Sequence, residues 1–387
     1  MKQRKKTNPL TFLIFAIFLV NCNSSGIEFS PGEIVDTPTP NYISEPPKNI
    51  ILFMADGMGF GHLSLAQLSQ QSKNTPSVWS QFEIKTWHDP RSHFGPLTDS
   101  EASATAIATG TSTNFGHIGI DIDGNHLKNI FEMASQQNYS TGIVTDSYVW
   151  DGTPSAFVAH IRNEDDARNI LTQMAESELD LLFGELEDLG EGDIPEKEES
   201  LEILRKRFLL LDSSLELPDK AKNGAPVAAI FQEDEVQDMD SSPNLLQLTK
   251  TALDYMSAHE KPFMLLVECE EIDSASHEND TKRVIRGLKS IQETLSFLLH
   301  FSKEDGETLL IFTSDHETGG FAALGDYNNY PKMRVRWTTK EHSAEVVPFF
   351  ATGPGANYFG DIERNIDIGN RLKKIISRDT LEAYIEQ

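Results

Sequence analysis

From residue 49 onward, short and almost wholly apolar runs alternate with longer stretches in which apolar residues recur every three or four positions. A short continuous apolar run is typical of a strand buried on both faces, whereas the longer spacing is typical of an amphipathic helix. The predicted strands are residues 49–55, 142–145, 179–183, 226–231, 262–267, 308–313 and 347–351. The predicted helices are residues 102–108, the beginning of 167–182, 244–259, 281–301 and 368–376.

This alternation of strands and helices predicts an α/β fold with a doubly wound, mostly parallel central sheet and helices on both faces. The length of 387 residues suits one large domain with elaborations, and we assign it to residues 49–387. A Glu-rich segment at 185–204 has few strong apolar positions. It is expected to form a solvated helix and loop on the surface.

The first 48 residues have a different pattern. Four basic residues precede an apolar run at 10–20, which is short for a bilayer span and typical of a signal peptide. The run ends just before Cys22 and resembles a loose lipobox, so residues 1–21 are predicted to be a signal peptide of the lipoprotein type. A plain secretory signal cleaved nearby is the alternative. Residues 22–48, rich in Pro and Ser, would then be a tether.

These segments predict a chain exported to the periplasm or the cell surface and attached to a bacterial membrane by a lipid on Cys22. The formal net charge of −27 argues against nucleic acid as a specific partner. Cys22 and Cys269 are the only cysteines, so no disulfide framework is implied. Such an acidic protein repels anionic substrates unless cations are bound in its site.

The stretch at 97–106 places Ser100 at the first turn of a predicted helix. Free backbone N–H groups and the helix dipole favour an anion at that position. A serine hydroxyl there is either a helix cap or a nucleophile. The stretch alone leaves both interpretations open.

Acidic residues follow three of the predicted strands: Asp56, Glu268 and Asp315. In an open α/β sheet, ligands bind beyond the carboxyl ends of the strands. One acid in such a place is usually a cap or a loop residue. Three acids at separate strand ends, two of them near histidines, indicate a shared site.

Two of these strand ends continue into spacings that suit a metal. Asp273 and His277 are four residues apart, so on one helical turn they would face the same way as a carboxylate–imidazole pair of the kind that holds Zn²⁺. His316 follows Asp315, and two glycines behind it allow a sharp turn. His342, taken alone, would be a loop or core histidine.

Together these motifs resemble the alkaline phosphatase family. In the family's order they are Asp-Gly-Met-Gly at 56–59, Thr-Asp-Ser at 98–100, Asp-Gly-Thr-Pro at 151–154, Glu-x4-Asp-x3-His at 268–277, Asp-His-Glu-Thr-Gly-Gly at 315–320, and His342 ahead of Val-Pro-Phe-Phe-Ala-Thr-Gly-Pro-Gly. The resemblance covers about residues 49–356. The short separation of His316 and His342 matches compact bacterial members, which have no large crown insertion.

The resemblance implies two Zn²⁺ and one Mg²⁺, although carboxylate-rich sites with histidine also accept Co²⁺ or Mn²⁺. One zinc would be held by Asp273, His277 and His342, and the other by Asp56, Asp315, His316 and the Ser100 oxygen. Magnesium would share Asp56 with Thr153 and Glu268, with Asp151 beside it.

The resemblance also implies an enzyme that hydrolyses phosphate monoesters of small phosphorylated substrates through a phosphoserine at Ser100, releasing inorganic phosphate. Coordination to zinc would stabilise the serine alkoxide. By analogy alone, it further suggests a homodimer.

Some positions depart from the family pattern. Where the family has an arginine that clamps phosphate through two hydrogen bonds, this chain has Glu164. Arg162 is the expected substitute as a catalytic residue, and Arg168 is the alternative. Glu101 follows the nucleophile in place of a small residue, and Ser274 replaces a Lys, His or Trp.

Two alternatives to the phosphomonoesterase stay open on these grounds. One is a phosphodiesterase or other phosphoryl hydrolase on the same metal core. The other is a pseudoenzyme, a metal-binding lipoprotein whose phosphate clamp has decayed. The intact ligand sets favour the enzyme, whereas Glu101 and Glu164 favour the alternatives.

Overall fold

The structure is a computed structural model that describes residues 46–70, 77–186, 197–236, 243–325 and 333–378. The predicted signal peptide, Cys22 and all but the last residues of the predicted tether lie outside these ranges. The Lys48 N–H donates to the Glu307 carbonyl, 2.9 Å away, so the chain joins the domain at this point. Among the described residues, no helix has the length and apolar character needed to cross a bilayer.

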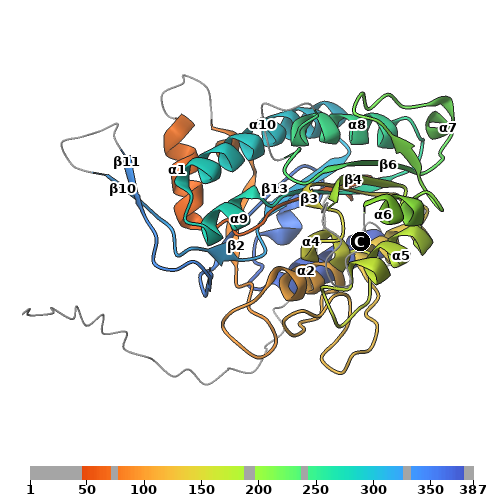
Figure 1. Ribbon diagram of the computed structural model, residues 1–387. Coiled ribbons are helices and arrows are strands. Elements are labelled where there is room, and N and C mark those ends of the chain that lie inside the picture. The colour runs from red at the N-terminus through yellow and green to blue at the C-terminus, as the bar shows by residue number, and fades with distance from the viewer. Residues whose placement is uncertain (1–45, 71–76, 187–196, 237–242, 326–332, 379–387) are drawn as a thin grey trace, which may run out of the picture. The chain divides into compact units, whose positions relative to one another are not determined.

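A nine-stranded sheet runs through the centre of the described domain (Figure 1). Its order is β2 (Ile84–His88), β13 (Val347–Thr352), β8 (Thr308–Thr313), β1 (Asn49–Ala55), β7 (Phe263–Cys269), β3 (Ser140–Tyr148), β4 (Leu181–Leu186), β6 (Val227–Gln232) and β5 (Leu209–Leu211). Neighbouring strands pair in parallel except at β13, which is antiparallel to both β8 and β2. The predicted mostly parallel sheet is confirmed.

Strand β1 shows why the central strands are apolar throughout. Its residues Ile50 and Leu52 pack into the core on one face of the sheet, and Ile51 and Phe53 pack into the core on the other. All four side chains are fully buried. Since successive side chains of a strand point to opposite faces, a strand covered on both sides needs an unbroken apolar run.

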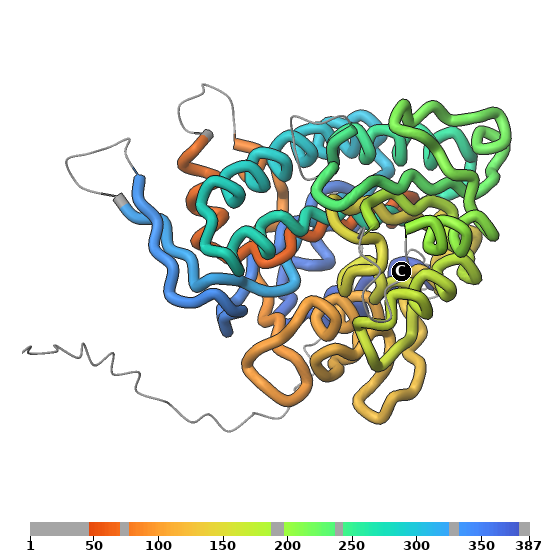
Figure 2. The backbone as a smooth tube through the Cα atoms, viewed as in Figure 1, coloured from red at the N-terminus to blue at the C-terminus, as the bar shows by residue number. Residues whose placement is uncertain are grey.

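Helices cover both faces of the sheet, as Figure 1 and the tube in Figure 2 show. The core on one face includes residues of α1 (Phe60–Gln70), η1 (Val78–Gln81), α7 (Asp219–Lys222), α8 (Leu245–Ser257), α9 (Glu271–His277) and α10 (Thr281–Asp305). The core on the other includes residues of α2 (Ser100–Thr109), α3 (Ile130–Gln136), α4 (Gly152–Ala156), α5 (Ala167–Glu176), α6 (Lys197–Leu204), η2 (Ala356–Phe359) and α11 (Asn365–Ser377). The fold is therefore doubly wound, as predicted.

Two small antiparallel pairs lie outside the main sheet. They are β10 (Ala322–Gly325) with β11 (Met333–Arg336), and β9 (Glu317–Thr318) with β12 (His342–Ser343). In the second pair, His342 is the register partner of Thr318. This pairing brings His342 back to the end of β8, beside His316.

Several element boundaries differ from the sequence-based predictions. Glu268 lies inside β7 rather than after it, because the strand continues to Cys269. Glu185, assigned to a solvated segment, is a buried residue of β4 whose carboxylate accepts backbone N–H groups from Asp234 and Val236. The short strands β2 and β5 were not predicted, because they lack a continuous apolar run or are very short.

Candidate active site

The predicted site residues converge at the carboxyl ends of four neighbouring parallel strands. Asp315 and His316 follow β8, Asp56 follows β1, Glu268 is the penultimate residue of β7, and Asp151 lies three residues beyond β3. These strands are adjacent in the order β8, β1, β7, β3. The sheet topology therefore brings residues from distant parts of the sequence to a single edge.

A glycine brings the end of β1 against helix α9. Gly57 has a φ of 70°, and a Cβ at this position would lie 2.7 Å from the Cα of Asp273. A side chain here would therefore face both left-handed strain and a backbone collision. The close approach holds Asp56 next to α9, which carries Asp273 and His277.

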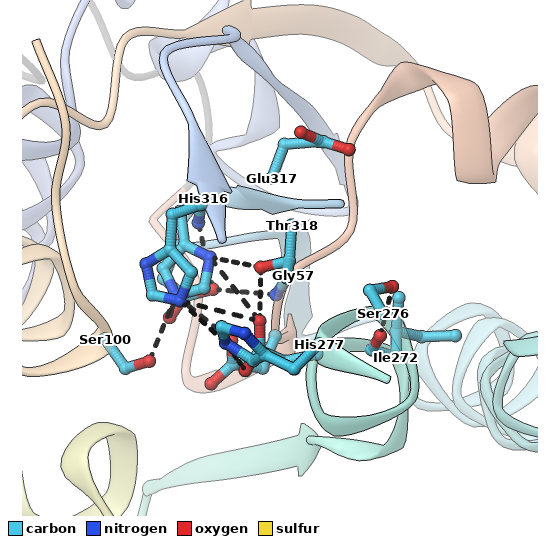
Figure 3. A network of polar contacts seen from close by, with 12 residues as sticks. Gly57, Ser100, Ile272, Ser276, His277, His316, Glu317 and Thr318 are labelled. Carbon is cyan, nitrogen blue, oxygen red and sulfur yellow. Dashed lines mark hydrogen bonds and ion pairs between the residues drawn. The ribbon is translucent and has the colours of Figure 1, made fainter. Parts of the chain in front are cut away.

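Ser100 is the first residue of α2, but it does not cap the helix. The cap is Asp99, whose side chain accepts the Ala102 N–H at 2.8 Å. The Ser100 Oγ atom instead lies 3.1 Å from Nε2 of His316, and Figure 3 shows the two side chains facing each other. The hydroxyl is thus presented to the metal-ligand residues at the positive end of a helix.

Asp273, His277 and His342 form the first predicted zinc set, and their ligand atoms cluster together. Nδ1 of His277 lies 2.5 Å from the Lys340 carbonyl, and Nδ1 of His342 lies 2.8 Å from the Thr98 carbonyl. When Nδ1–H donates to a carbonyl, the Nε2 atom of a neutral imidazole carries a lone pair. The two Nε2 atoms face each other at 3.1 Å, beside the Asp273 carboxylate. This donor set fits a Zn²⁺ ion.

Asp56, Asp315 and His316 form the second predicted zinc set, and all three are buried. Nε2 of His316 lies 3.4 Å from Oδ1 of Asp56 and 3.5 Å from Oδ2 of Asp315. Within the described residues, those two carboxylate oxygens are buried and have no hydrogen-bond partner. A buried carboxylate oxygen without a donor is costly unless a cation neutralises it. The set therefore also fits a metal.

The predicted magnesium set also contains buried oxygen atoms without a hydrogen-bond partner among the described residues. Oγ1 of Thr153 and Oε1 of Glu268 are buried, and neither has a hydrogen-bond partner in the described part of the chain. Asp151, predicted to lie beside the magnesium, accepts the Ser147 hydroxyl and the Gly152 N–H, each at 2.8 Å. Oxygen ligands next to a fixed carboxylate suit a hard cation such as Mg²⁺.

The pKa shifts of these groups follow from burial and mutual repulsion. Burial raises the pKa of Asp56 and Glu268 well above the ordinary range, and neighbouring carboxylates add to both shifts. Burial also raises the pKa of Asp315 to about 7. The hydrogen bond that His277 donates to the Asp273 carboxylate raises the pKa of His277 to about 9. Without bound cations, burial and mutual repulsion therefore disfavour the ionised form of these carboxyl groups.

Some residues that hold the ligands in place were not predicted from the sequence. The Thr145 hydroxyl donates to Oε2 of Glu268 at 2.6 Å, and the Thr318 hydroxyl contacts both Asp273 and Nδ1 of His316. Thr145 lies in β3 directly opposite Glu268 in β7, so the strand register could have revealed it. Thr318 lies inside the motif at 315–320, two residues after the metal-ligand candidate His316.

Arg162 and Arg168 are the two arginines predicted as candidates for the phosphate contact. Arg168 forms an ion pair with Glu199 of α6, so its guanidinium is engaged there. Arg162 is exposed, and its Nη2 atom would lie 2.4 Å from a Cβ at Gly124. Among the described residues, Arg162 forms no ion pair. Its role as a phosphate contact stays a prediction.

A third carboxylate cluster lies directly beside the nucleophile. Ligand atoms of Asp99, Glu101 and Glu164 lie within 4.8 Å of one another. Burial raises the pKa of Glu101 well above the ordinary range, and the charges of Asp99 and Glu164 raise it further. Glu101 and Glu164, singled out as departures from the family pattern, are thus brought together.

Comparisons with known proteins agree with this geometry. The family model described as alkaline phosphatase matches residues 47–186 and 221–334. Alkaline phosphatase 4 of Bacillus subtilis is 26% identical and covers 85% of this chain and 88% of its own length. The streptomycin-6-phosphate phosphatase of Streptomyces griseus is 22% identical over 84% of this chain and 89% of its own.

Solved structures of alkaline phosphatases are also similar to this chain. The alkaline phosphatase of the Antarctic bacterium TAB5 superposes with a TM-score of 0.78 at 28% identity, covering 86% of this chain and 98% of that one. A variant of that enzyme, with Mg bound in its M3 site, superposes with a TM-score of 0.77 at 28% identity over 86% of this chain and 99% of its own. Fold, candidate site and relatives indicate a metal-dependent phosphatase, and the chain belongs to the alkaline phosphatase family.

Proposed function

We propose that this chain hydrolyses phosphate monoesters through a phosphoserine at Ser100, with two Zn²⁺ and one Mg²⁺ as cofactors. The observation that carries the proposal is the placement of the Ser100 hydroxyl 3.1 Å from Nε2 of His316, at the first turn of α2. Asp99 caps that helix, so the Ser100 oxygen has no capping role to fulfil. The hydroxyl is free to attack phosphorus.

The chain's own residues orient the groups that take part. Nδ1 of His316 lies 3.2 Å from the Thr318 hydroxyl, a contact that fixes the ring with Nε2 toward Ser100. The two predicted zinc sets and Asp56, Thr153 and Glu268 would hold the three metals. When bound, the metals would lower the pKa of the serine hydroxyl and stabilise charge on the phosphoryl oxygens. The resulting phosphoserine is then hydrolysed to free the enzyme and inorganic phosphate.

Small phosphorylated molecules are the proposed substrates. Support comes from the relative named for its action on streptomycin-6-phosphate, a small phosphate ester, and from the family. Arg162 is the proposed phosphate contact from the chain itself. Replacing it with Ala should raise the KM for phosphate esters if it reaches the substrate, and should leave KM unchanged if it does not.

The experiment compares hydrolysis of p-nitrophenyl phosphate and bis-p-nitrophenyl phosphate by the full chain loaded with Zn²⁺ and Mg²⁺. The variants are Ser100→Ala and, as a matched control, Ser80→Ala, which removes an exposed hydroxyl that donates to the Ser77 carbonyl. We expect the monoester to be favoured and its turnover to depend on Ser100 only. Preferred diester hydrolysis would favour a phosphodiesterase, and no serine-dependent turnover of either ester would favour a pseudoenzyme.

We also propose that the chain is exported and lipid-anchored at Cys22, which lies outside the described residues. The support is the sequence pattern at 1–22. Expression in a bacterial host with labelled palmitate should label the wild-type chain and leave Cys22→Ser unlabelled. A homodimer is proposed by analogy with other oligomeric enzymes only, and sedimentation of the soluble Cys22→Ser protein tests it.

A further inference from the structure

We propose that His62 is a positioning residue that holds the end of α9, and with it the zinc-ligand candidate His277, in place. His62 lies in α1 and belongs to neither predicted zinc set. It also lies outside the motifs from which those sets were predicted. The inference rests on the zinc sites of the proposed function, and it adds a residue that orients one of their ligands.

Three contacts join the His62 side chain to the three segments that carry zinc-ligand candidates. Nδ1 lies 3.3 Å from the backbone nitrogen of Gly59, in the turn after β1. Nε2 lies 3.2 Å from the Ser276 hydroxyl, in the last turn of α9. The ring stacks on Phe321, which lies just beyond β9, with 4.4 Å between the ring centroids. The imidazole therefore lies where these three segments meet.

The direction of the hydrogen bonds fixes the proton on the His62 ring. The Gly59 N–H can only donate, so Nδ1 accepts. The Ser276 hydroxyl donates its single proton to the Ile272 carbonyl at 2.6 Å, so its oxygen accepts from Nε2–H of His62. The ring is therefore neutral, with its proton on Nε2. Burial lowers the pKa of His62 to about 3, which keeps the ring in this form.

The contact with Ser276 matters because burial alone does not fix His277. The His277 side chain is 37% exposed, whereas Ser276 and His62 are fully buried. Helix α9 has only seven residues, and helix ends fray unless other contacts hold them. In Figure 3 the His277 ring points toward His316 and away from Ser276. The hydrogen bond from His62 thus anchors the buried side of the turn whose other side carries the zinc-ligand candidate.

The start of α1 is packed closely against the segment that begins with β9. A Cβ at Gly59 would collide with the Glu317 side chain, and one at Gly61 would collide with the Phe321 carbonyl oxygen. These close contacts leave room only for glycine. His62 is therefore attached to backbone that cannot move independently of that segment. Its Nε2–H links α9 to the same fixed backbone.

The test measures zinc affinity and ligand geometry in the full chain. The variants are His62→Asn, His62→Gln and Ser276→Ala. The Gln amide can replace the Nε2–H donor, whereas the Asn amide can replace only the Nδ1 acceptor. Thr249→Val is the matched control, because the buried Thr249 hydroxyl of α8 also donates to the carbonyl four residues earlier.

Three measurements are made on each protein. Competition with a zinc-binding dye gives the affinity of the site formed by Asp273, His277 and His342. The absorption spectrum of the Co²⁺-substituted protein reports the geometry of the metal ligands, which a purely structural role of His62 would leave unchanged. Denaturant unfolding shows whether each variant is folded.

We expect His62→Asn and Ser276→Ala to bind this zinc about tenfold more weakly than the wild type and to change the Co²⁺ spectrum. His62→Gln should recover most of the lost affinity, and Thr249→Val should match the wild type. If His62→Asn does not fold, Ser276→Ala and Thr249→Val are compared against the same expectations.

Two results would overturn the inference while leaving the proposed zinc sites intact. One is a wild type that binds zinc with the same affinity and Co²⁺ spectrum as His62→Asn and Ser276→Ala. The other is an equal loss of affinity in His62→Gln and His62→Asn, which would assign His62 to folding alone. A wild type that binds no zinc would overturn the proposed zinc sites and this inference together.

Discussion

Nε2 of His277 lies 3.1 Å from Nε2 of His342, while Nδ1 of each ring faces a backbone carbonyl. The two residues are far apart in sequence and come from α9 and β12. When Nδ1–H of each ring donates to the carbonyl of Lys340 or Thr98, the Nε2 atoms of the neutral rings present two lone pairs to the same point. This is the arrangement that a tetrahedral metal requires.

Replacing His342 with Asn should therefore remove one zinc. We expect the purified variant to contain about one equivalent less zinc than the wild type, because one nitrogen ligand is lost. Phosphatase activity should fall by more than about 100-fold. His126→Asn is the control, since His126 is an exposed histidine outside the ligand sets. Elemental analysis of both proteins checks the prediction, and an unchanged zinc content in His342→Asn would contradict it.

Thr318 positions ligands of both zinc sets through one hydroxyl. It donates to Asp273 and lies 3.2 Å from Nδ1 of His316. Thr318→Val keeps the side-chain shape but removes these contacts, so zinc affinity should fall by about 10- to 100-fold. The effect should appear as a shift in competition with a zinc-binding dye. Thr172→Val on α5 removes a hydroxyl bound to the Arg168 carbonyl, and it should not shift the competition curve.

Gly57 and Gly306 provide a matched pair for testing the turn after β1. Both have positive φ, 70° and 68°, but a Cβ at Gly306 meets nothing within 4 Å, whereas one at Gly57 lies 2.7 Å from the Asp273 Cα. Gly306→Ala should cost about 1–2 kcal/mol from left-handed strain alone. Gly57→Ala should cost at least about 1–3 kcal/mol more, because the backbone must shift. Denaturant unfolding measures both, and equal costs would show that the collision is unimportant.

The metal-free protein should lose stability as pH rises from 7 to 9. The hydrogen bond that His277 donates to the Asp273 carboxylate raises the pKa of His277 to about 9, above its ordinary value of 6.5. A group whose folded pKa is raised stabilises the fold below its unfolded pKa, and that stabilisation is lost as pH rises through the folded pKa. The lowered pKa of His316 acts only below its ordinary range and does not oppose this trend.

Metal binding should reverse the pH trend, because zinc takes the place of the proton on His277. The measurement is the Tm of chelator-treated and zinc-loaded protein at pH 7 and pH 9. The chelated protein should melt at a lower temperature at pH 9 than at pH 7, and the zinc-loaded protein should not. A higher Tm for the chelated protein at pH 9 would show that His277 is not held by Asp273.

Much of this site could be predicted from the sequence because its residues lie in short motifs. Apolar runs locate the strands. Because ligands bind at the carboxyl ends of parallel strands, the sequence alone predicts that Asp56 and Asp315 lie in one site. The position of His342 could not be predicted from residue spacing. The pairing of β9 with β12 brings His342 next to His316, and these two short strands have no apolar pattern that predicts them. Contacts such as Thr145 to Glu268 depend on strand register, which the sequence leaves open.

The replacement for a phosphate-clamping arginine could not be settled from sequence either. Side-chain direction decides whether a guanidinium reaches a site, and spacing along a loop does not determine direction. Arg168 is engaged with Glu199, and Arg162 lies against Gly124. The meeting of Glu101 with Glu164 likewise depends on loop geometry near Gly152 and Gly116, which only the structure shows.

The reaction proposed for this chain requires that Ser100 form a covalent bond to phosphorus. The most direct measurement incubates the metal-loaded full chain with labelled inorganic phosphate at mildly acidic pH, quenches the reaction with acid, and maps the label by mass spectrometry of peptides. Acid favours the phosphoserine because its hydrolysis requires a deprotonated nucleophile. We expect label on the peptide that contains Ser100, and none in Ser100→Ala. Label on another residue, or turnover of phosphate esters with no labelled serine in the wild type, would contradict it.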